Sequence, residues 1–197
     1  MVLAGHLVFT AYGFWLPNDP RGSWSDFVRS IPLRQYGPPT KTTVRHSVAA
    51  VVHDVAQRRA AKTALTFPPV QFTGEQAREV ARGIRDAVAE SNYHVLACAI
   101  LPDHVHVVVR THANPFPRIV GHFKQRATER LLASRLHPMQ HQIQTSDQRI
   151  SCWTSRGWKV FLYDRESIEH AIQYVNMNPV RCGLKRQTWS FVQPLNH

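Results

Sequence analysis

LPDHVHVVVR, residues 101–110, has the composition of a strand suited to a buried sheet, but it carries two histidines one residue apart. Because residues i and i+2 of a strand point to the same side, His104 and His106 share one face with Val108. Val105 and the other two valines of the run share the opposite face, which can pack a core. The pattern predicts a strand that buries its valine face and carries two neighbouring imidazoles near its start.

Two interpretations of this histidine pair are open from the strand alone. The rings can be surface groups held by hydrogen bonds, or they can be two ligands of one metal ion, since neutral imidazole is a common ligand. Two ligands do not complete a metal site. The second interpretation therefore requires a third ligand elsewhere in the chain.

The elements around this strand follow an order that is typical of an α+β sandwich. Thr73 and Gln76 form a capping box that predicts the start of a clear helix, which ends near Ser91. Asn114 is predicted to cap the next helix, and Asp164 a last helix that Pro179 stops. Strands are expected at residues 3–12, 93–101, 104–111 and within 152–164, with a possible further helix at 47–64.

This order of strand, helix, strand, strand, helix, strand and C-terminal helix predicts a ferredoxin-like (RRM-like) α+β sandwich. Its antiparallel sheet would have helices packed on one face, and the C-terminal helix would follow. The chain of 197 residues suits a single domain, residues 1–197. Residues 13–69, rich in proline and glycine turns, are predicted to be an insertion into that domain.

Composition narrows the class of protein. The net charge of +11 predicts a polyanionic partner, most commonly nucleic acid. Three scattered cysteines give neither a disulfide framework nor a zinc pattern. No apolar run has the length of a bilayer span, and no signal peptide is recognisable at the start. We therefore expect a cytoplasmic protein without a membrane partner, associated with the nucleoid if it is bacterial.

The C-terminal helix, RESIEHAIQYVNMN at residues 165–178, supplies further polar groups. Its apolar stripe includes Ile168 and Val175, and Tyr174 and Asn178 lie together on one flank of that stripe. A flank between core and solvent lets side chains reach into a cleft. In the alternative interpretation, Tyr174 packs at the edge of the core and Asn178 only ends the helix.

Together these segments resemble the HUH endonucleases, in which two histidines flank a hydrophobic residue. LPDHVHVVV (101–109) is similar to the HUH motif itself, and YVNMNPVRCGL (174–184) to the tyrosine helix of single-tyrosine, IS200-like transposases. The second segment is most similar to REP-associated tyrosine transposases, whose helix typically reads Tyr-x-x-x-Asn-Pro-Val. The segments at 153–174 and 10–24 also resemble members of that group, whereas residues 26–72 and 137–148 are not accounted for.

The resemblance implies a function and a site. It implies a transposase-type enzyme that nicks single-stranded DNA near hairpins and transfers the strand through a covalent 5′-phosphotyrosine. Tyr174 would be the nucleophile, and His104, His106 and Asn178 would hold a divalent metal, Mg²⁺ or Mn²⁺. The partner would be single-stranded DNA with hairpin, palindromic elements. The protein would act as a monomer or a homodimer.

Basic and aromatic residues are candidates for contacts with that DNA. Arginine and lysine side chains bind phosphates, and tryptophans such as Trp24 and Trp153 can stack on bases. The candidate phosphate contacts are Arg118, Lys124, Arg126 and Arg130 on the second long helix, and Arg181, Lys185 and Arg186 after Pro179.

Three other functions are compatible with parts of the pattern. A non-catalytic single-stranded nucleic-acid-binding module would keep the sheet without the chemistry. A rolling-circle initiator or relaxase would use the same chemistry but usually carries further domains. A metalloenzyme of the double-stranded β-barrel type would need more strands and downstream Glu and His ligands, which the sequence lacks.

Overall fold

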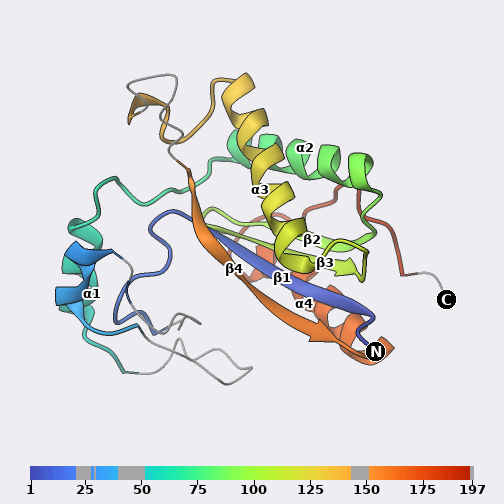
Figure 1. The fold of residues 1–197 in the computed structure, drawn as a ribbon, viewed down its shortest axis with the longest axis horizontal. Coiled ribbons are helices and arrows are strands. Elements are labelled where there is room, and N and C mark those ends of the chain that lie inside the picture. Colours follow the sequence, from blue (N-terminus) through green and yellow to red (C-terminus); the bar gives the residue numbers. More distant parts are fainter. Residues whose placement is uncertain (21–27, 29, 40–51, 143–150, 196–197) are drawn as a thin grey trace. The chain divides into compact units, whose positions relative to one another are not determined.

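The computed structural model describes residues 1–20, 28, 30–39, 52–142 and 151–195 (Figure 1). Trp24 and the part of the possible helix at 47–51 lie outside these residues. The chain divides into two compact units, Met1–Ala11 with Gln71–His197, and Tyr12–Val70. The second unit spans nearly the range of the predicted insertion, and the first carries the sheet and the histidine pair.

Helices and strands occur close to their predicted places. No helix among the described residues has the length and hydropathy needed to cross a membrane. The elements are β1 (Ala4–Ala11), the 3-10 helix η1 (Ile31–Tyr36), α1 (Val55–Thr63), α2 (Gly74–Ser91), β2 (Val95–Ile100), β3 (His104–Arg110), α3 (Phe116–Ala133), the 3-10 helix η2 (Gln140–Gln142), β4 (Trp153–Leu162) and α4 (Arg165–Arg181).

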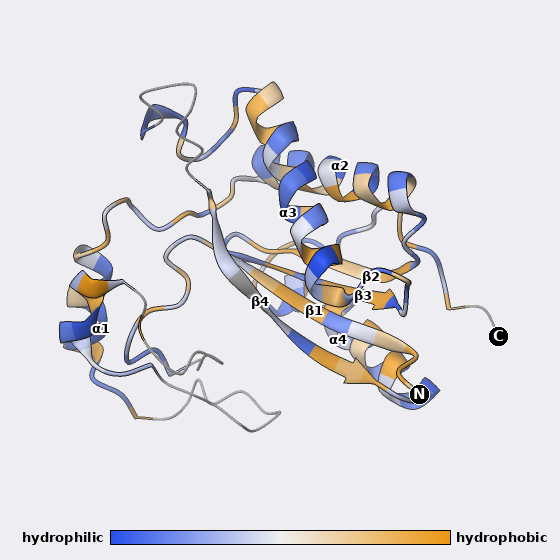
Figure 2. Ribbon diagram, viewed as in Figure 1, coloured by the Kyte–Doolittle hydropathy of each residue, from blue (hydrophilic) through white to orange (hydrophobic). Residues whose placement is uncertain are grey.

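The four strands form one sheet with the order β2-β3-β1-β4, in which every neighbouring pair is antiparallel. β1 therefore lies in the middle, with Leu7 opposite Val107 of β3 on one side and Lys159 of β4 on the other. Figure 2 shows the apolar character of the inner strands. The element order and the strand order together confirm the predicted ferredoxin-like α+β sandwich.

Helices cover both faces of this sheet. On one face, the Phe116 ring of α3 lies against Gly5 of β1, and the Lys124 ammonium group lies 5.9 Å from the centre of the Phe9 ring. On the opposite face, Ala4 and Val108 share a core cluster with residues of α4. The predicted helical layer is thus formed by α2 and α3, and the tyrosine-bearing α4 adds a second layer on the histidine face.

The predicted helix starts are confirmed for α2 and α4. The Thr73 hydroxyl accepts a hydrogen bond from the Gln76 amide at 3.3 Å, and the Gln76 side chain accepts one from the Thr73 amide at 2.9 Å. The Asp164 carboxylate accepts one from the Ser167 amide at 2.7 Å. These bonds satisfy amides that have no partner within the helix.

Two other predictions, for the start of α3 and for the end of α4, are wrong. α3 begins after Pro115 with no side-chain cap, because the side chain of Asn114 donates a hydrogen bond from its Nδ2 atom to the Tyr93 hydroxyl instead. Pro179 does not stop α4, which continues to Arg181. Proline removes only one intrahelical bond there, and the amides of Cys182 and Leu184 still bond to carbonyls of the last turn.

Gly83 of α2 lies against the backbone of α3. A Cβ atom at this position would collide with backbone atoms of Arg126 and Ala127, which cannot rotate away. We expect Gly83→Ala to lower the free energy of unfolding by about 2–4 kcal/mol, measured by urea denaturation. Gly74→Ala is the matched control, since nothing lies within 4 Å of its Cβ position. Equal stability of the Gly83→Ala variant and the wild type would contradict this packing.

Candidate active site around the histidine pair

The two histidines of β3 lie side by side at its start, as the alternation predicts. The centres of the His104 and His106 rings are 4.8 Å apart, and the rings are tilted by 76°. Tyr174 of α4 faces this pair, with its ring centre 5.7 Å from that of His106. The strand and the C-terminal helix thus bring the predicted tyrosine and histidines together.

Asp103 holds His104. Its carboxylate lies 2.6 Å from the Nδ1 atom of His104, which donates the hydrogen bond. In the neutral ring a proton on Nδ1 leaves the lone pair on Nε2. The bond therefore selects the tautomer whose Nε2 can bind a proton donor or a metal.

A third histidine, His6 of β1, joins the site and was missed in the sequence. Its Nε2 atom lies 3.0 Å from the Nδ1 atom of His106, and its ring centre is 5.8 Å from that of Tyr174. The only sequence signal is an imidazole in a mostly apolar strand, on the face shared with Ala4 and Val8. That signal does not identify the partner, because the partner is 100 residues away.

Burial keeps two of these imidazoles neutral. It lowers the pKa of His6 to about 4. It also lowers the pKa of His106 well below the usual value, and positive charge on His104 or His6 would lower it further. A protonated ring in this site would lose its hydration, and neutral rings keep lone pairs for hydrogen bonds or metal binding.

Asn178 lies one turn beyond Tyr174 on α4. Its side chain is buried, with 8% of its surface exposed. The amide nitrogen finds no hydrogen-bond partner among the residues that the structure describes. An unsatisfied buried amide is costly, so a bound group that engages this side chain would remove a penalty.

A family model described as "Transposase IS200 like" matches residues 69–178, which is more than half of the chain. The chain belongs to the IS200-like transposase family. The resemblance identified from the histidine and tyrosine motifs is thereby confirmed. The matched range contains β3 and the tyrosine of α4, but it begins after β1.

Solved structures of transposases also resemble this member of the family. A REP-associated tyrosine transposase, solved bound to a REP hairpin, is 12% identical with a TM-score of 0.47, covering 93% of this chain and 70% of that one. A candidate transposase from Deinococcus radiodurans R1 is 11% identical with a TM-score of 0.40, covering 89% of each chain. No curated protein matches this chain.

The residues of this transposase-family site fit a divalent metal in part. Within the described residues, no group of three or more His, Cys, Asp or Glu side chains is arranged to hold a metal ion. His104, however, has its Nδ1 held by a carboxylate, as metal-binding histidines commonly do. The buried side chain of Asn178 carries an amide oxygen, a type of atom that binds divalent metal ions. Two imidazoles and an amide suit Mn²⁺ better than Mg²⁺, which prefers oxygen ligands.

Three basic residues follow the tyrosine in the chain, and the first of them lies beside its ring. The Arg181 guanidinium group is 5.7 Å from the centre of the Tyr174 ring, on the same helix. Lys185 and Arg186 are exposed, and Arg186 lies 3.6 Å from the sulfur of Met177. Three of the predicted phosphate contacts therefore belong to the segment that ends the tyrosine helix.

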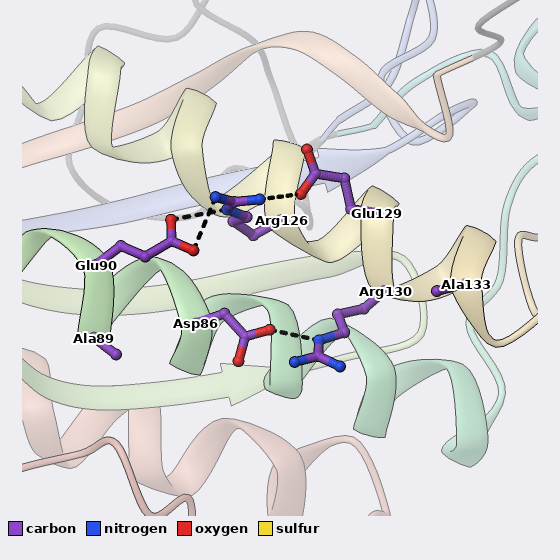
Figure 3. Close-up of a pocket in the computed structure, with 7 residues that line it drawn as sticks. All are labelled: Asp86, Ala89, Glu90, Arg126, Glu129, Arg130 and Ala133. Carbon is purple, nitrogen blue, oxygen red and sulfur yellow. Dashed lines mark hydrogen bonds and ion pairs between the residues drawn. The ribbon is translucent and has the colours of Figure 1, made fainter.

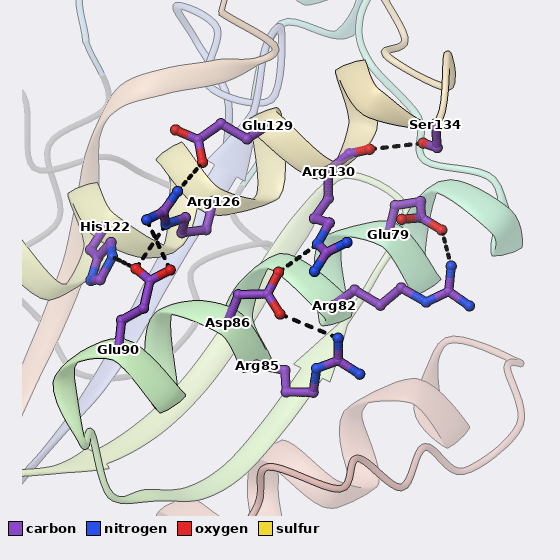
Figure 4. Close-up of polar contacts among 10 residues, drawn as sticks. All are labelled: Glu79, Arg82, Arg85, Asp86, Glu90, His122, Arg126, Glu129, Arg130 and Ser134. Atoms are coloured by element: carbon purple, nitrogen blue, oxygen red, sulfur yellow. Dashed lines mark hydrogen bonds and ion pairs between the residues drawn. The ribbon is translucent and has the colours of Figure 1, made fainter.

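The other four predicted phosphate contacts come from α3, on the opposite face of the sheet from Tyr174. Arg126 forms ion pairs with Glu90 and Glu129, and Arg130 with Asp86 (Figure 4). Figure 3 shows the hollow that these side chains line between α2 and α3. Its three carboxylates outnumber its two guanidinium groups, so it lacks the excess positive charge of a phosphate site. Arg118 is exposed near the start of α3.

Lys124 is mostly buried, and its ammonium group donates a hydrogen bond to the Thr154 carbonyl at 2.7 Å. Burial lowers its pKa from 10.5 to about 8. Between these two pH values the unfolded chain binds a proton that the folded chain does not, so folding stability should rise with pH. We expect the wild type to gain up to a few kcal/mol over Lys124→Met between pH 8 and pH 10.5.

The measurement is the free energy of unfolding of both proteins, by urea denaturation, at each pH. The difference between the two proteins isolates Lys124 from tyrosines and other lysines that titrate in the same range. A difference that does not change with pH would contradict the burial of this charge.

The environment of Trp153 bears on its predicted role in base stacking. Trp153 is buried, packs against Phe9 and Phe72, and donates a hydrogen bond from its indole nitrogen to Thr128. It therefore belongs to the core.

Proposed function

We propose that this protein is a metal-dependent single-stranded DNA endonuclease and strand transferase that acts through a covalent 5′-phosphotyrosine. The observation that carries the proposal is the approach of the Tyr174 ring to within 5.7 Å of the His106 ring, between centres. A nucleophile on one element and paired imidazoles on another are what this reaction needs. Membership of the IS200-like transposase family supports the same chemistry.

Tyr174 would attack the scissile phosphorus through its hydroxyl oxygen, which gives up its proton. A bond forms between that oxygen and phosphorus, and the bond from phosphorus to the 3′ oxygen breaks. The leaving oxygen takes up a proton and becomes a free 3′ hydroxyl. One phosphate ester replaces another, so a second 3′ hydroxyl can reverse the step and join a new strand without an external energy source.

His104, His106 and Asn178 are the residues that would hold the metal ion. A divalent cation at a scissile phosphate neutralises its charge and orients it for in-line attack. Asp103 would keep the His104 ring in the tautomer needed for this contact. Arg181, beside the ring of Tyr174, would add a positive charge where the phosphate must bind.

Single-stranded DNA next to a hairpin is the proposed substrate. The net charge of +11 suits a nucleic acid, and the exposed basic side chains of Arg181, Lys185 and Arg186 would contact its phosphates. The four basic residues of α3 would have to contact a strand on the other face of the sheet. We therefore assign the DNA path next to the active site to the three residues that follow the tyrosine.

The test uses hairpin-bearing oligonucleotides incubated with the full chain and Mn²⁺, followed by denaturing electrophoresis. An oligonucleotide labelled at its 3′ end should give labelled protein, because the 5′ phosphate of the downstream strand stays on the tyrosine. The same oligonucleotide labelled at its 5′ end should give only a shorter free strand. EDTA should suppress both products.

Two outcomes would reject the proposal. Label on the protein from the 5′-labelled strand would mean the opposite polarity of attack. Binding of the oligonucleotide without any adduct, over a panel of hairpins and with either metal, would favour the non-catalytic binding module.

A further inference from the structure

His6 is the one histidine of the site to which the proposed chemistry gives no task. It lies on the central strand β1, and the diagonal from His6 to His106 follows from the register that pairs Val8 with His106. Its side chain is half-buried in the face covered by α4. A polar ring in this position must find a partner, and the partner it finds is the Nδ1 atom of His106 at 3.0 Å.

We propose that His6 is a positioning residue, whose Nε2 accepts a hydrogen bond from the Nδ1 of His106 and thereby turns the Nε2 of His106 toward the metal. The inference rests on the proposed function, because it assumes that His106 is a metal ligand. It adds a residue from outside the matched range 69–178 to the machinery of the site.

The two facing nitrogens share one proton, and its place decides what His106 can do. If the Nδ1 of His106 carries it, the lone pair of that ring is on Nε2, on the far side from His6. If His6 carries the proton between them instead, the Nδ1 atom of His106 accepts the hydrogen bond, and the neutral ring of His106 has its own proton on Nε2. Only the first arrangement leaves His106 a nitrogen for a ligand.

His104 shows the same arrangement with a different partner. Its Nδ1 is held at 2.6 Å by the carboxylate of Asp103, and the Nδ1 of His106 is held at 3.0 Å by His6. Each histidine of the pair is thus fixed through the same ring atom by its own neighbour. Such outer partners of metal-binding histidines set the tautomer and the orientation of the ring.

Contact with the tyrosine gives His6 a second constraint. Its ring meets that of Tyr174 edge-on, with centres 5.8 Å apart. The ring of His6 thus contacts both His106 and Tyr174, with ring centres 5.2 and 5.8 Å away. These two contacts limit its rotation and help to keep its Nε2 atom facing the Nδ1 atom of His106. A side chain without a hydrogen-bond acceptor at this position would fill the space but would not select the tautomer of His106.

The first test needs no metal and no DNA. Two-bond ¹H–¹⁵N spectra of the full chain report which nitrogen of each imidazole carries the proton. We expect His106 of the wild type to be protonated on Nδ1, and His6→Leu to shift His106 toward the Nε2-protonated form. Protonation of His106 on Nε2 in the wild type would overturn the inference.

The second test measures Mn²⁺ affinity by electron paramagnetic resonance titration of the full chain. His6→Leu should weaken binding by about 10–100-fold, the usual effect of losing an outer partner. His6→Gln should stay within about threefold of the wild type, because its amide oxygen can accept the same hydrogen bond. His141→Leu, an exposed histidine of η2, is the control and should not change affinity.

Three outcomes separate this inference from the proposed function. Unchanged affinity in His106→Ala would reject the metal site itself. Weakened binding in His106→Ala but not in His6→Leu would reject only the positioning role. Equal weakening by His6→Leu and His6→Gln, or three coordinated ¹⁵N nuclei in place of two after histidine labelling, would make His6 a ligand and overturn its role as a partner.

Discussion

Tyr174→Phe is expected to abolish the covalent protein–DNA adduct, with a loss of at least about a thousandfold in strand cleavage. The hydroxyl oxygen is the atom that forms the new bond to phosphorus, and no other atom of the ring can replace it. The change leaves the ring in contact with His6, His106 and Arg181. We therefore expect the variant to keep its stability and its affinity for hairpin DNA.

Tyr163→Phe is the matched control for this variant. Tyr163 is also an exposed tyrosine of the C-terminal third, with 55% of its surface exposed compared with 43% for Tyr174. Tyr163 lies before α4, so the Tyr163→Phe variant should form the adduct through Tyr174 at the rate of the wild type. An adduct that persists in Tyr174→Phe and disappears in Tyr163→Phe would move the nucleophile to the other residue.

His104→Ala and His106→Ala are expected to weaken Mn²⁺ binding and DNA cleavage by about a hundredfold or more, while affinity for the DNA changes little. Each substitution removes one of the two proposed imidazole ligands. Binding to single-stranded DNA depends mostly on contacts between basic side chains and phosphates, and neither substitution removes such a contact. Calorimetry with Mn²⁺, a cleavage time course and fluorescence anisotropy measure the three quantities separately.

The third histidine variant, His141→Ala, controls for a general effect of losing an imidazole. Unfolding curves of all three variants should be recorded, because His106 is buried and its replacement leaves a small cavity. Full cleavage by both site variants would show that the reaction does not use these histidines. Loss of DNA affinity together with cleavage would instead place the pair in the DNA-binding surface.

Local patterns in the sequence predict most of the elements of the fold. The alternation around His104 and His106 predicts β3 and its two faces, and the bonds from Thr73 and Asp164 start helices where they are expected. These features depend on neighbours within four residues. The predicted cap at Asn114 is wrong because its side chain bonds to Tyr93, which is 21 residues away and is not part of the local pattern.

Only part of the candidate site can be predicted from the sequence. Its histidine pair, tyrosine and asparagine are recognisable because each pair is close in the chain. The bond between His6 and His106 depends on the pairing of β1 with β3, and the covering of that face by α4 depends on the packed sheet. Pairings over such separations leave no local pattern, so they emerge only with the tertiary structure.

The basic residues of α3 show the same limitation in another form. A helix rich in arginine has the composition of a phosphate-binding surface, yet Arg126 and Arg130 form ion pairs with carboxylates of α2. Net charge is a property of the whole chain, and ion pairs between helices decide which part of it remains for a partner. Among the described residues, we therefore expect the basic side chains at the end of α4, rather than those of α3, to contact the phosphates of DNA.

The central place of β1 has a consequence for synthesis. β1 is synthesised before both of its neighbours, β3 and β4, which are made more than 90 residues later. At about 5–20 residues per second, its apolar face waits for several seconds or longer without a partner strand. A fragment restricted to residues 69–178 would lack this strand, so its β3 and β4 would have nothing between them. We expect such a fragment to aggregate during expression rather than yield a folded domain.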